Sequence, residues 1–388
     1  MILIRNGKVF TGAGRNYEKG CVLINGSKIA EVGEDIATTA DMGVIDAEGG
    51  WIVPGLIDAH CHVGIFEEDM GFEGLDGNES VDPVTPQLRA IDAVNPMDAA
   101  FNEALEAGIT TVMTGPGSAN VIGGQFVAMK THGTSIDDMI ILEPAAVKVA
   151  FGENPKRVYS NQKKMPSTRM GTAAVLRETL TKARNYKAKK EKAAQKGEDM
   201  EIDFKLEAML PVLNKVIPLK AHAHRADDIL TALRIAKEFD VLITLDHCTD
   251  GHLIPEYIKA SGAPALIGPT MTFRTKIETR NKSFSTPKVL KEHGVKLAII
   301  TDHPVTPIQY LPICAGLAAK EGLGIEEALN AITINAAEIC GIADRVGSIE
   351  PGKDADIAIF SGNPMEIFTE TLYTFIDGKI AYKNSKTV

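Results

Sequence analysis

Residues 51–62 decide the fold, and they read WIVPGLIDAHCH. The apolar run predicts a short buried strand with His60 and His62 at its end. Because alternate side chains of a strand project from one face, the two imidazoles point the same way and Cys61 points the other way. Two imidazoles at this spacing can hold one divalent ion, with Zn–N distances of about 2.0–2.1 Å. On its own, a pair of histidines at this spacing is a weak motif. A buried pair of imidazoles, however, needs polar partners that compensate for the loss of their hydration.

Three later apolar runs end in similar chemistry. They close, in chain order, on His222 and His224, on His247, and on Asp302 and His303. Barrel enzymes place their catalytic groups at the C-terminal ends of several strands. Any one of these histidines is more often a packed or surface residue, whereas four strand ends of this kind predict a single shared site.

The middle of the chain alternates strand-like and helix-like segments, which predicts a parallel sheet covered by helices. Over residues 54–344 the alternation fits a distorted (β/α)₈ TIM barrel, an α/β fold of ~250 residues plus insertions. A doubly wound open sheet is the alternative, but no Gly-x-Gly-x-x-Gly follows the first strand. The strand-like runs are Ile109–Met113, Met139–Leu142, Val216–Ala221, Val241–Leu245, Ala265–Ile267 and Val295–Thr301, and the helix-like segments are Pro96–Ala107, Ala226–Phe239, Thr286–His293 and Gly324–Cys340.

The two ends of the chain are rich in strand signals. Residues 1–53 and 345–388 contain short apolar runs, such as Ile2–Phe10 and Cys21–Val32. Hairpin turns are predicted at Asn6-Gly7, Asn25-Gly26 and Asp377-Gly378. Because chain ends often lie close together, we expect both ends to build one small β-sandwich domain.

Two insertions interrupt the barrel pattern, near residues 65–95 and 156–200. The second is strongly basic, and residues 174–195 are predicted to be helical. A solvated insertion is the favoured interpretation of such a charge run. The alternative is a lid whose Arg157, Tyr159 or Arg169 meets an anionic substrate.

Composition narrows the class of protein. The formal net charge of −10 disfavours nucleic acid or an anionic membrane as a partner. The sequence contains no run of about 18 uncharged apolar residues, so no membrane span is predicted. The five cysteines are widely spaced without a Cys-x-x-Cys pair, which favours a reducing compartment, with the cytoplasm as the expected location.

With these motifs in place, the chain resembles the amidohydrolase superfamily, a group of metal-dependent hydrolases. The resemblance rests on Pro54–His62, on the later histidines and Asp302, and on the tail Gly347–Asp356. It covers essentially the whole chain and is closest to members related to imidazolonepropionase and to prolidase-like peptidases. The resemblance is weakest at the two insertions.

The resemblance implies a metal site shared by several strands. His60, His62 and Asp302 would bind one ion, and His222 and His247 a second, with His224 as the alternative to His222. One or two divalent ions are implied. Zn²⁺ is the expected ion, and Mn²⁺, Fe²⁺ and Co²⁺ use similar ligands.

Two-metal members also need a bridging anion. Lys148 lies in an apolar run, where burial would depress its pKa and its neutral amine could be carboxylated by CO₂. The alternatives are a lysine that reaches solvent or pairs with Glu143 or Glu153, and Glu153 is also the leading alternative bridge.

The predicted reaction is hydrolysis of a C–N bond in an amide, cyclic amide or peptide-like small molecule by metal-activated water. Asp302 would bind metal and transfer the proton, with Arg274 and His303 as weaker candidates for substrate contact. A deaminase acting on a nitrogen heterocycle is the alternative enzyme. A non-catalytic assembly protein and a nucleic-acid binder are the rivals of other classes. A homo-oligomer is expected, since closed dimers are common.

Overall fold

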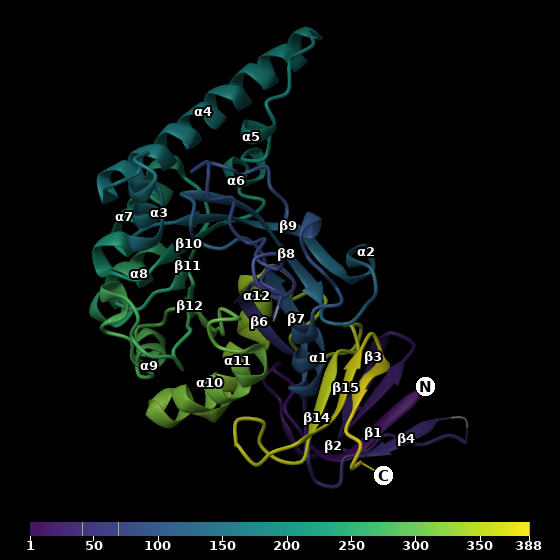
Figure 1. Ribbon diagram of the computed structural model, residues 1–388. Coiled ribbons are helices and arrows are strands. Elements are labelled where there is room, and N and C mark those ends of the chain that lie inside the picture. Colours follow the sequence, from purple (N-terminus) through teal and green to yellow (C-terminus); the bar gives the residue numbers. More distant parts are fainter. Residues whose placement is uncertain (41, 69, 388) are drawn as a thin grey trace.

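The computed structural model describes residues 1–40, 42–68 and 70–387, and its strands form two eight-stranded sheets. Figure 1 shows one sheet curved within a surround of helices and the other beside both chain termini. A mixed α/β architecture is therefore confirmed, with the barrel sheet and the terminal sheet as its two parts.

The barrel sheet is almost closed. Its strands are all parallel except β8, which pairs antiparallel with both neighbours. The backbone N–H of Asp302 donates to the carbonyl of His60 at 3.1 Å, and that of His62 donates to the carbonyl of His303 at 2.9 Å, so the first strand meets the segment after the last. In sheet order the strands are β13 (Leu297–Ile299), β12 (Ala265–Ile267), β11 (Ile243–His247), β10 (Leu219–Ala223), β9 (Ile140–Ala150), β8 (Ile122–Lys130), β7 (Ile109–Thr114) and β6 (Leu56–Cys61).

The antiparallel strand β8 corrects the expectation of an all-parallel barrel. Only residues 115–121 separate it from β7, which is too short for the helical crossover that a parallel pair requires. The sequence hides this strand because Gly123 and Gly124 interrupt its apolar pattern.

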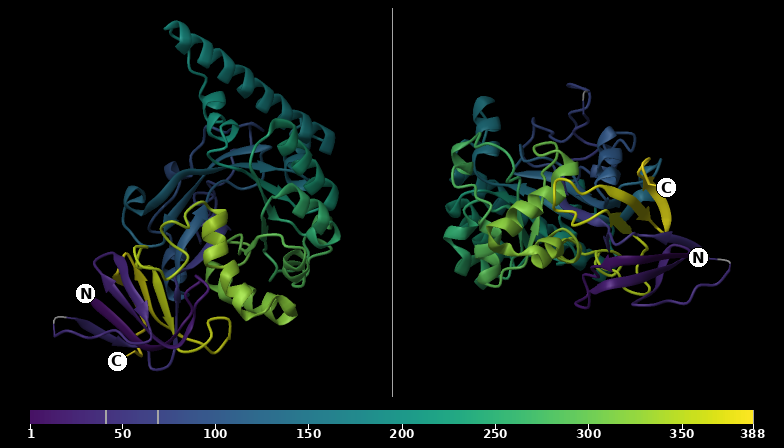
Figure 2. Two further views of the ribbon diagram at one scale, coloured as in Figure 1. Left: turned by 180° about the vertical axis from the view of Figure 1, so that it is seen from behind. Right: turned by 90° about the horizontal axis from the view of Figure 1, so that it is seen from below.

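Helices cover the outside of the barrel sheet (Figures 1 and 2). The predicted helix over 226–239 coincides with α7, and the prediction over 324–340 is divided in two because Thr333 leaves helical geometry at φ −136° and ψ −102°. The α-helices are α1 (Ala99–Glu106), α2 (Ile136–Met139), α3 (Glu153–Asn161), α4 (Arg169–Lys196), α5 (Phe204–Glu207), α6 (Leu210–Leu213), α7 (Ala226–Phe239), α8 (Pro255–Ser261), α9 (Thr286–Glu292), α10 (Leu311–Ala318), α11 (Ile325–Ala331) and α12 (Ile334–Ile339).

The terminal sheet contains strands from both ends of the chain. Its order is β16-β15-β14-β5-β1-β2-β3, with β4 paired to β1, so β14 from the C-terminal part lies beside β5. The two-layer sandwich and its boundaries stay predictions, and the boundary after residue 53 falls inside β5. The strands are β1 (Ile2–Val9), β2 (Tyr17–Asn25), β3 (Lys28–Gly33), β4 (Gly43–Asp46), β5 (Trp51–Pro54), β14 (Ile357–Phe360), β15 (Thr371–Ile376) and β16 (Lys379–Lys383).

Two of the three predicted hairpin turns are confirmed. Asn25-Gly26 joins β2 to β3 and Asp377-Gly378 joins β15 to β16. The turn at Asn6-Gly7 was predicted wrongly, because β1 runs through it with a shift of register. A Cβ atom at Gly7 would lie 2.6 Å from the Ile52 side chain, so glycine serves close packing there.

Buried ion pairs attach the terminal sheet to the barrel. Lys130 at the end of β8 donates to Asp354 at 3.0 Å and to Asp356 at 2.6 Å, and all three side chains are buried. A lone buried ammonium would be costly, so the pairing fixes how the C-terminal segment returns across the barrel.

The basic insertion forms α3 and the long helix α4, which projects from the barrel (Figure 1). The predicted helix over 174–195 lies within α4. Acidic partners accompany its cations, as in the pairs Lys182–Glu178 and Arg177–Glu238. These exposed pairs support the interpretation of a solvated insertion.

Candidate metal centre

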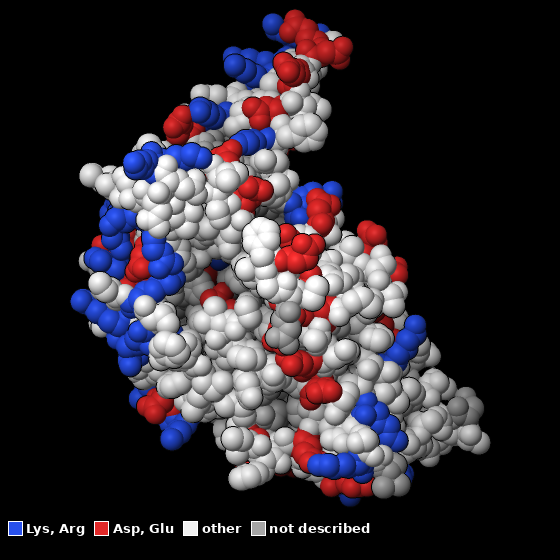
Figure 3. Space-filling view, viewed as in Figure 1, with Lys and Arg blue, Asp and Glu red and all other residues white. Residues whose placement is uncertain are grey.

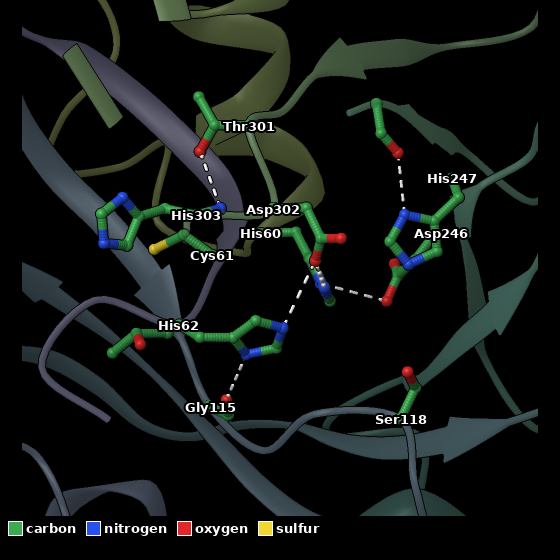
Figure 4. A network of polar contacts seen from close by, with 12 residues as sticks. His60, Cys61, His62, Gly115, Ser118, Asp246, His247, Thr301, Asp302 and His303 are labelled. Atoms are coloured by element: carbon green, nitrogen blue, oxygen red, sulfur yellow. Dashed lines mark hydrogen bonds and ion pairs between the residues drawn. The ribbon is translucent and has the colours of Figure 1, made fainter. Parts of the chain in front are cut away.

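The first group of ligand atoms, which we call the Asp302 cluster, consists of His60, His62 and Asp302. The Nε2 atoms of both histidines lie 3.3 Å from Oδ1 of Asp302, and all three side chains converge in Figure 4. Two atoms that bind one zinc ion tetrahedrally are about 3.4 Å apart. The separations therefore fit three donors around a single cation.

Neighbouring groups fix the direction of these imidazoles. Nδ1 of His62 donates to the carbonyl of Gly115 at 2.7 Å, and Nδ1 of His60 lies 3.2 Å from Oδ2 of Asp246. The hydrogen bond to Gly115 sets the tautomer of His62 and leaves its Nε2 free to bind a metal, and the Asp246 carboxylate faces Nδ1 of His60. The sequence prediction that His60 and His62 act together is thus supported by their geometry.

The second group, the three-histidine cluster, consists of His222, His224 and His247 from the ends of β10 and β11. The ring centroid of His247 is 4.4 Å from that of His222 and 4.7 Å from that of His224. Its Nδ1 donates to the carbonyl of Gly268 at 2.7 Å, and Nδ1 of His224 contacts the Thr249 hydroxyl at 2.8 Å. Both rings thus turn Nε2 toward the shared space.

The two clusters are adjacent. The rings of His60 and His247 lie 5.4 Å apart between centroids. His247 and Asp302 both have left-handed backbone, with φ of 69° and 55°. Such conformations cost energy in residues other than glycine and accumulate at functional sites. The strand ends therefore converge as the sequence predicted.

Burial sets the charge of the ligands. It lowers the pKa of His222, His224 and His247 well below the usual range, so these imidazoles are neutral near pH 7. Burial alone would raise the pKa of Asp302, but His247, His60 and His62 hold it well below its usual value. Neutral imidazoles and an ionised carboxylate are the states that bind a metal cation.

Lys148 lies on β9 with its ammonium beside the Asp302 cluster. Its Nζ is 3.3 Å from Nε2 of His60 and donates to Oδ2 of Asp246 at 3.2 Å. The side chain is 1% exposed, and burial lowers its pKa. It does not reach solvent, and its carboxylate partner is Asp246, whereas Glu143 pairs with Arg89 and Glu153 with Arg157.

Sequence reasoning missed the anion that holds this region together, Asp246. Its fully buried carboxylate lies 3.2 Å from His60 Nδ1, 3.2 Å from Lys148 Nζ and 3.3 Å from Lys220 Nζ. Burial favours the neutral acid, but Lys220, His60 and Lys148 keep its pKa well below the usual value. Its position directly before His247 was the available signal.

Glu278 was also missed, because it lies in a connection without periodicity between β12 and α9. The side chain is 3% exposed. Its Oε2 accepts from the backbone N–H of Glu153 at 2.9 Å, and its Oε1 is 3.9 Å from Nε2 of both His222 and His224. Among the described residues, Oε1 and His222 Nε2 have no hydrogen-bond partner, so polar atoms face one another across a gap.

The candidate residues of the insertion lie outside the two clusters. Tyr159 is fully buried and donates to Asn120 at 2.8 Å. Arg157 is exposed and pairs with Glu153 at 3.6 Å. The alternative bridge Glu153 thus has its carboxylate turned to Arg157, and only its backbone N–H approaches the centre through Glu278.

The remaining candidates are occupied by structural contacts. Arg169 pairs with the buried Asp228 at 3.0 Å. The Arg274 guanidinium donates to the backbone carbonyls of Arg280 and Lys282. His303 is buried and its Nδ1 accepts from the N–H of Ile308, while its Nε2 has no partner among the described residues.

A divalent cation fits this donor set. The imidazoles of the three-histidine cluster are neutral, and His222 Nε2 and Glu278 Oε1 are buried without hydrogen-bond partners among the described residues. Buried polar atoms of this kind are rare unless a ligand or ion satisfies them. Imidazole with carboxylate suits zinc and the neighbouring first-row metals.

Comparison with known proteins identifies the family of this chain. A family model described as "Amidohydrolase family" matches residues 51–381. The chain belongs to the amidohydrolase family. A solved amidohydrolase from Thermotoga maritima is 44% identical, with a TM-score of 0.96 over 99% of this chain and 100% of that one.

More distant relatives of this amidohydrolase were found as well. The amidohydrolase tasK of Hapsidospora irregularis is 27% identical over 97% of this chain, which spans only 42% of that relative's length. The imidazolonepropionase of Rhizobium meliloti (strain 1021) is 26% identical, over 89% of this chain and 85% of that one. A solved prolidase, 18% identical with a TM-score of 0.61 over 99% of this chain and 100% of that one, shows the shared fold. The predicted resemblance is confirmed.

Proposed function

We propose that this amidohydrolase cleaves the C–N bond of an amide, cyclic amide or peptide-like small molecule with the help of one or two divalent metal ions. The observation that carries the proposal is the convergence of two largely buried ligand groups at one end of one barrel. Such a set supports metal-assisted hydrolysis better than an assembly role, which has no use for buried, unpaired ligand atoms.

The ligands divide between the clusters. His60, His62 and Asp302 would hold one ion, and His222 and His247 a second, with His224 as the alternative to His222. Zn²⁺ is the expected ion. When bound, the metal would make a water acidic enough to attack near neutral pH and would polarise the scissile carbonyl.

Asp302 is the proposed proton carrier. Its side chain is 15% exposed, against 9% for His62 and 0% for His60, so the carboxylate is the most accessible member of its cluster. It would accept the proton of the attacking water and deliver it to the leaving nitrogen.

Two further residues would complete the centre. A carboxylated Lys148 is the proposed bridging anion, because the amine is buried, its pKa is lowered and it touches His60. Glu278 would supply negative charge beside the three-histidine cluster, since its Oε1 lies 3.9 Å from Nε2 of both His222 and His224.

The experiment is turnover by the zinc-loaded protein against cyclic amides, N-acyl amino acids, dipeptides and aminopurines. We expect cleavage of one of the first three classes and loss of turnover in Asp302→Asn. Undiminished turnover in that variant would exclude the proton carrier, and a purified protein that neither contains nor binds metal would support the assembly role.

Deamination of a nitrogen heterocycle is the second candidate, and Glu278 is the observation that favours it. A buried carboxylate beside the centre could exchange protons with a ring nitrogen. Release of ammonia from an aminopurine by a one-metal enzyme would establish this activity, whereas two ions and a carboxylated Lys148 would favour amide hydrolysis.

We further propose that the enzyme works in the cytoplasm as a homo-oligomer. All five cysteines are free and buried, which suits a reducing compartment. Within the part of the chain that the structure describes, no helix is long and apolar enough to cross a membrane. Light scattering on the purified protein would give the oligomeric state, and a monomer at micromolar concentration would contradict it.

A further inference from the structure

The segment 270–285, between β12 and α9, is basic and lies beside the metal centre. It carries a single acid, Glu278, which is buried. Its four cations are Arg274, Lys276, Arg280 and Lys282. Near the centre of the face in Figure 3 the surface is hollowed, with acidic side chains visible inside. What this basic segment does next to the metal centre depends on what each of its cations contacts.

Two of the cations hold the segment in place. The Arg274 guanidinium donates to the carbonyls of Arg280 and Lys282 at 2.9 and 3.0 Å. Lys276 donates to Asn154 at 2.7 Å and lies 3.7 Å from Glu278. The Arg280 side chain is exposed. None of these three cations is both sheltered and free.

Lys282 differs from the other three. Its side chain is only partly exposed, and among the described residues its ammonium has neither a hydrogen bond nor an ion pair. It lines a small hollow together with His247, Gly268 and Thr270. Burial lowers the pKa of Lys282, and the nearby Asp302 carboxylate acts against that change. An ammonium beside the metal centre that has no counter-charge among the described residues can pair with an anionic ligand.

We propose that Lys282 binds an anionic group of the substrate, such as a carboxylate, and so restricts the enzyme to acidic amides. This inference rests on the proposed function, because the hollow that Lys282 lines is shared with the ligand His247. A bound carboxylate would give the ammonium the charge-assisted hydrogen bond that the protein does not provide. An N-acyl amino acid or a dipeptide carries such a group, whereas an uncharged cyclic amide and an aminopurine do not.

The test compares substrates that differ only in this charge. Glycyl-leucine is set against glycyl-leucinamide, and N-acetyl-leucine against N-acetyl-leucinamide, with the zinc-loaded enzyme. We expect wild type to prefer the acid of the cleaved pair by about 10- to 100-fold in kcat/KM, the range for a hydrogen bond to a charged group. Lys282→Met should abolish the preference mainly through KM, and Lys282→Arg should retain part of it.

The matched control is Arg280→Met, which removes the same charge from the same segment at an exposed position. It should leave the ratio of acid to amide unchanged. Because Lys282→Met removes a charge that has no partner among the described residues, its melting temperature should stay close to that of wild type, so lost selectivity will not reflect misfolding. An acid preference that survives in Lys282→Met, or that falls equally in Arg280→Met, would overturn the inference.

Direct binding separates this inference from the proposed function. Calorimetry of the same four compounds with Asp302→Asn, with and without Lys282→Met, measures the anion site without turnover. We expect the acids to bind more tightly than the amides only where Lys282 is present, and equal binding would overturn the proposal. If no compound is cleaved but the acids still bind through Lys282, the proposed hydrolysis fails and the anion site stands.

Discussion

The Asp302 cluster and the three-histidine cluster lie side by side but differ in charge. The Asp302 cluster contains a carboxylate 3.3 Å from two imidazoles. The three-histidine cluster contains only neutral rings, and the nearest acid, Glu278, is 3.9 Å from two of them. The first cluster therefore has its own counter-charge for a cation, and the second depends on anions supplied by its neighbours.

This difference indicates that the two clusters would bind metal unequally. A divalent ion in the Asp302 cluster meets an ionised ligand directly. An ion in the three-histidine cluster would rely on Glu278 and on a carboxylated Lys148. We therefore expect the Asp302 cluster to bind its metal ion first. Metal binding by the three-histidine cluster should be more sensitive to substitutions of neighbouring residues.

The largest effect is expected from removing the counter-charge of the Asp302 cluster. Asp302→Asn should lower kcat by about 10³-fold or more, because both a metal ligand and the proton carrier are lost. Its zinc content, measured by elemental analysis, should fall too. A variant that keeps its zinc and more than about a tenth of its turnover would place the chemistry elsewhere.

Removing one imidazole from the three-histidine cluster should show whether the two clusters bind zinc independently. His247→Ala should lower the zinc content from about two ions per chain to about one and leave the Asp302 cluster filled. Elemental analysis after dialysis against limiting chelator gives the result, with the exposed His293→Ala as the control. Loss of both ions together would show that the clusters form one indivisible site.

Glu278 tests whether a neighbouring anion supports the three-histidine cluster. Glu278→Gln keeps an oxygen for the N–H of Glu153 but loses the charge, and it should weaken the second ion by about 10- to 100-fold. Lys276→Gln removes the ion pair of Glu278 and leaves its carboxylate in place. If Lys276→Gln weakens zinc binding as much as Glu278→Gln does, the role of Glu278 is structural.

The smallest expected effect is on the pH dependence of stability, and it involves the buried acid Asp228 near the three-histidine cluster. Burial raises the pKa of Asp228 to about 6 despite its pairing with Arg169. The unfolded chain releases this proton near its ordinary pKa of 3.8, so the stabilisation from the neutral acid is present below pH 3.8 and is lost as pH rises through 6.

Asp228→Asn should remove this dependence. Between pH 4.5 and 7, the free energy of unfolding of the variant should rise relative to wild type by about 2 kcal/mol. Urea unfolding in the presence of chelator at the two pH values measures the change. A difference between variant and wild type that is independent of pH would contradict the raised pKa.

The sequence predicted which candidate ligand side chains would converge because they lie at the ends of apolar runs. The position of His60, His62, His247 and Asp302 along their strands fixes which way each side chain points. It could not predict Asp246 or Glu278, because their importance comes from partners distant in the chain. Lys282 was hidden for the same reason, since nothing in its neighbours along the chain says that its ammonium lies near the metal centre without a partner among the described residues.

The fold, like the candidate ligands, was predictable where the local sequence pattern is regular. The period of α7 and the apolar runs of the parallel strands carried the prediction of a barrel. The antiparallel β8 was missed because its glycines interrupt the pattern. The turn predicted at Asn6-Gly7 was wrong because Gly7 is required for packing against Ile52 and not for reversing the chain.

Anomalous diffraction from zinc-loaded crystals tests the central claim most directly. We predict one zinc peak within bonding distance of His60, His62 and Asp302, and a second, weaker peak within bonding distance of His222 or His224 and of His247. Zinc peaks found only elsewhere on the molecule, or no peak at either cluster in protein that has been saturated with zinc, would contradict a metal-dependent centre at this end of the barrel.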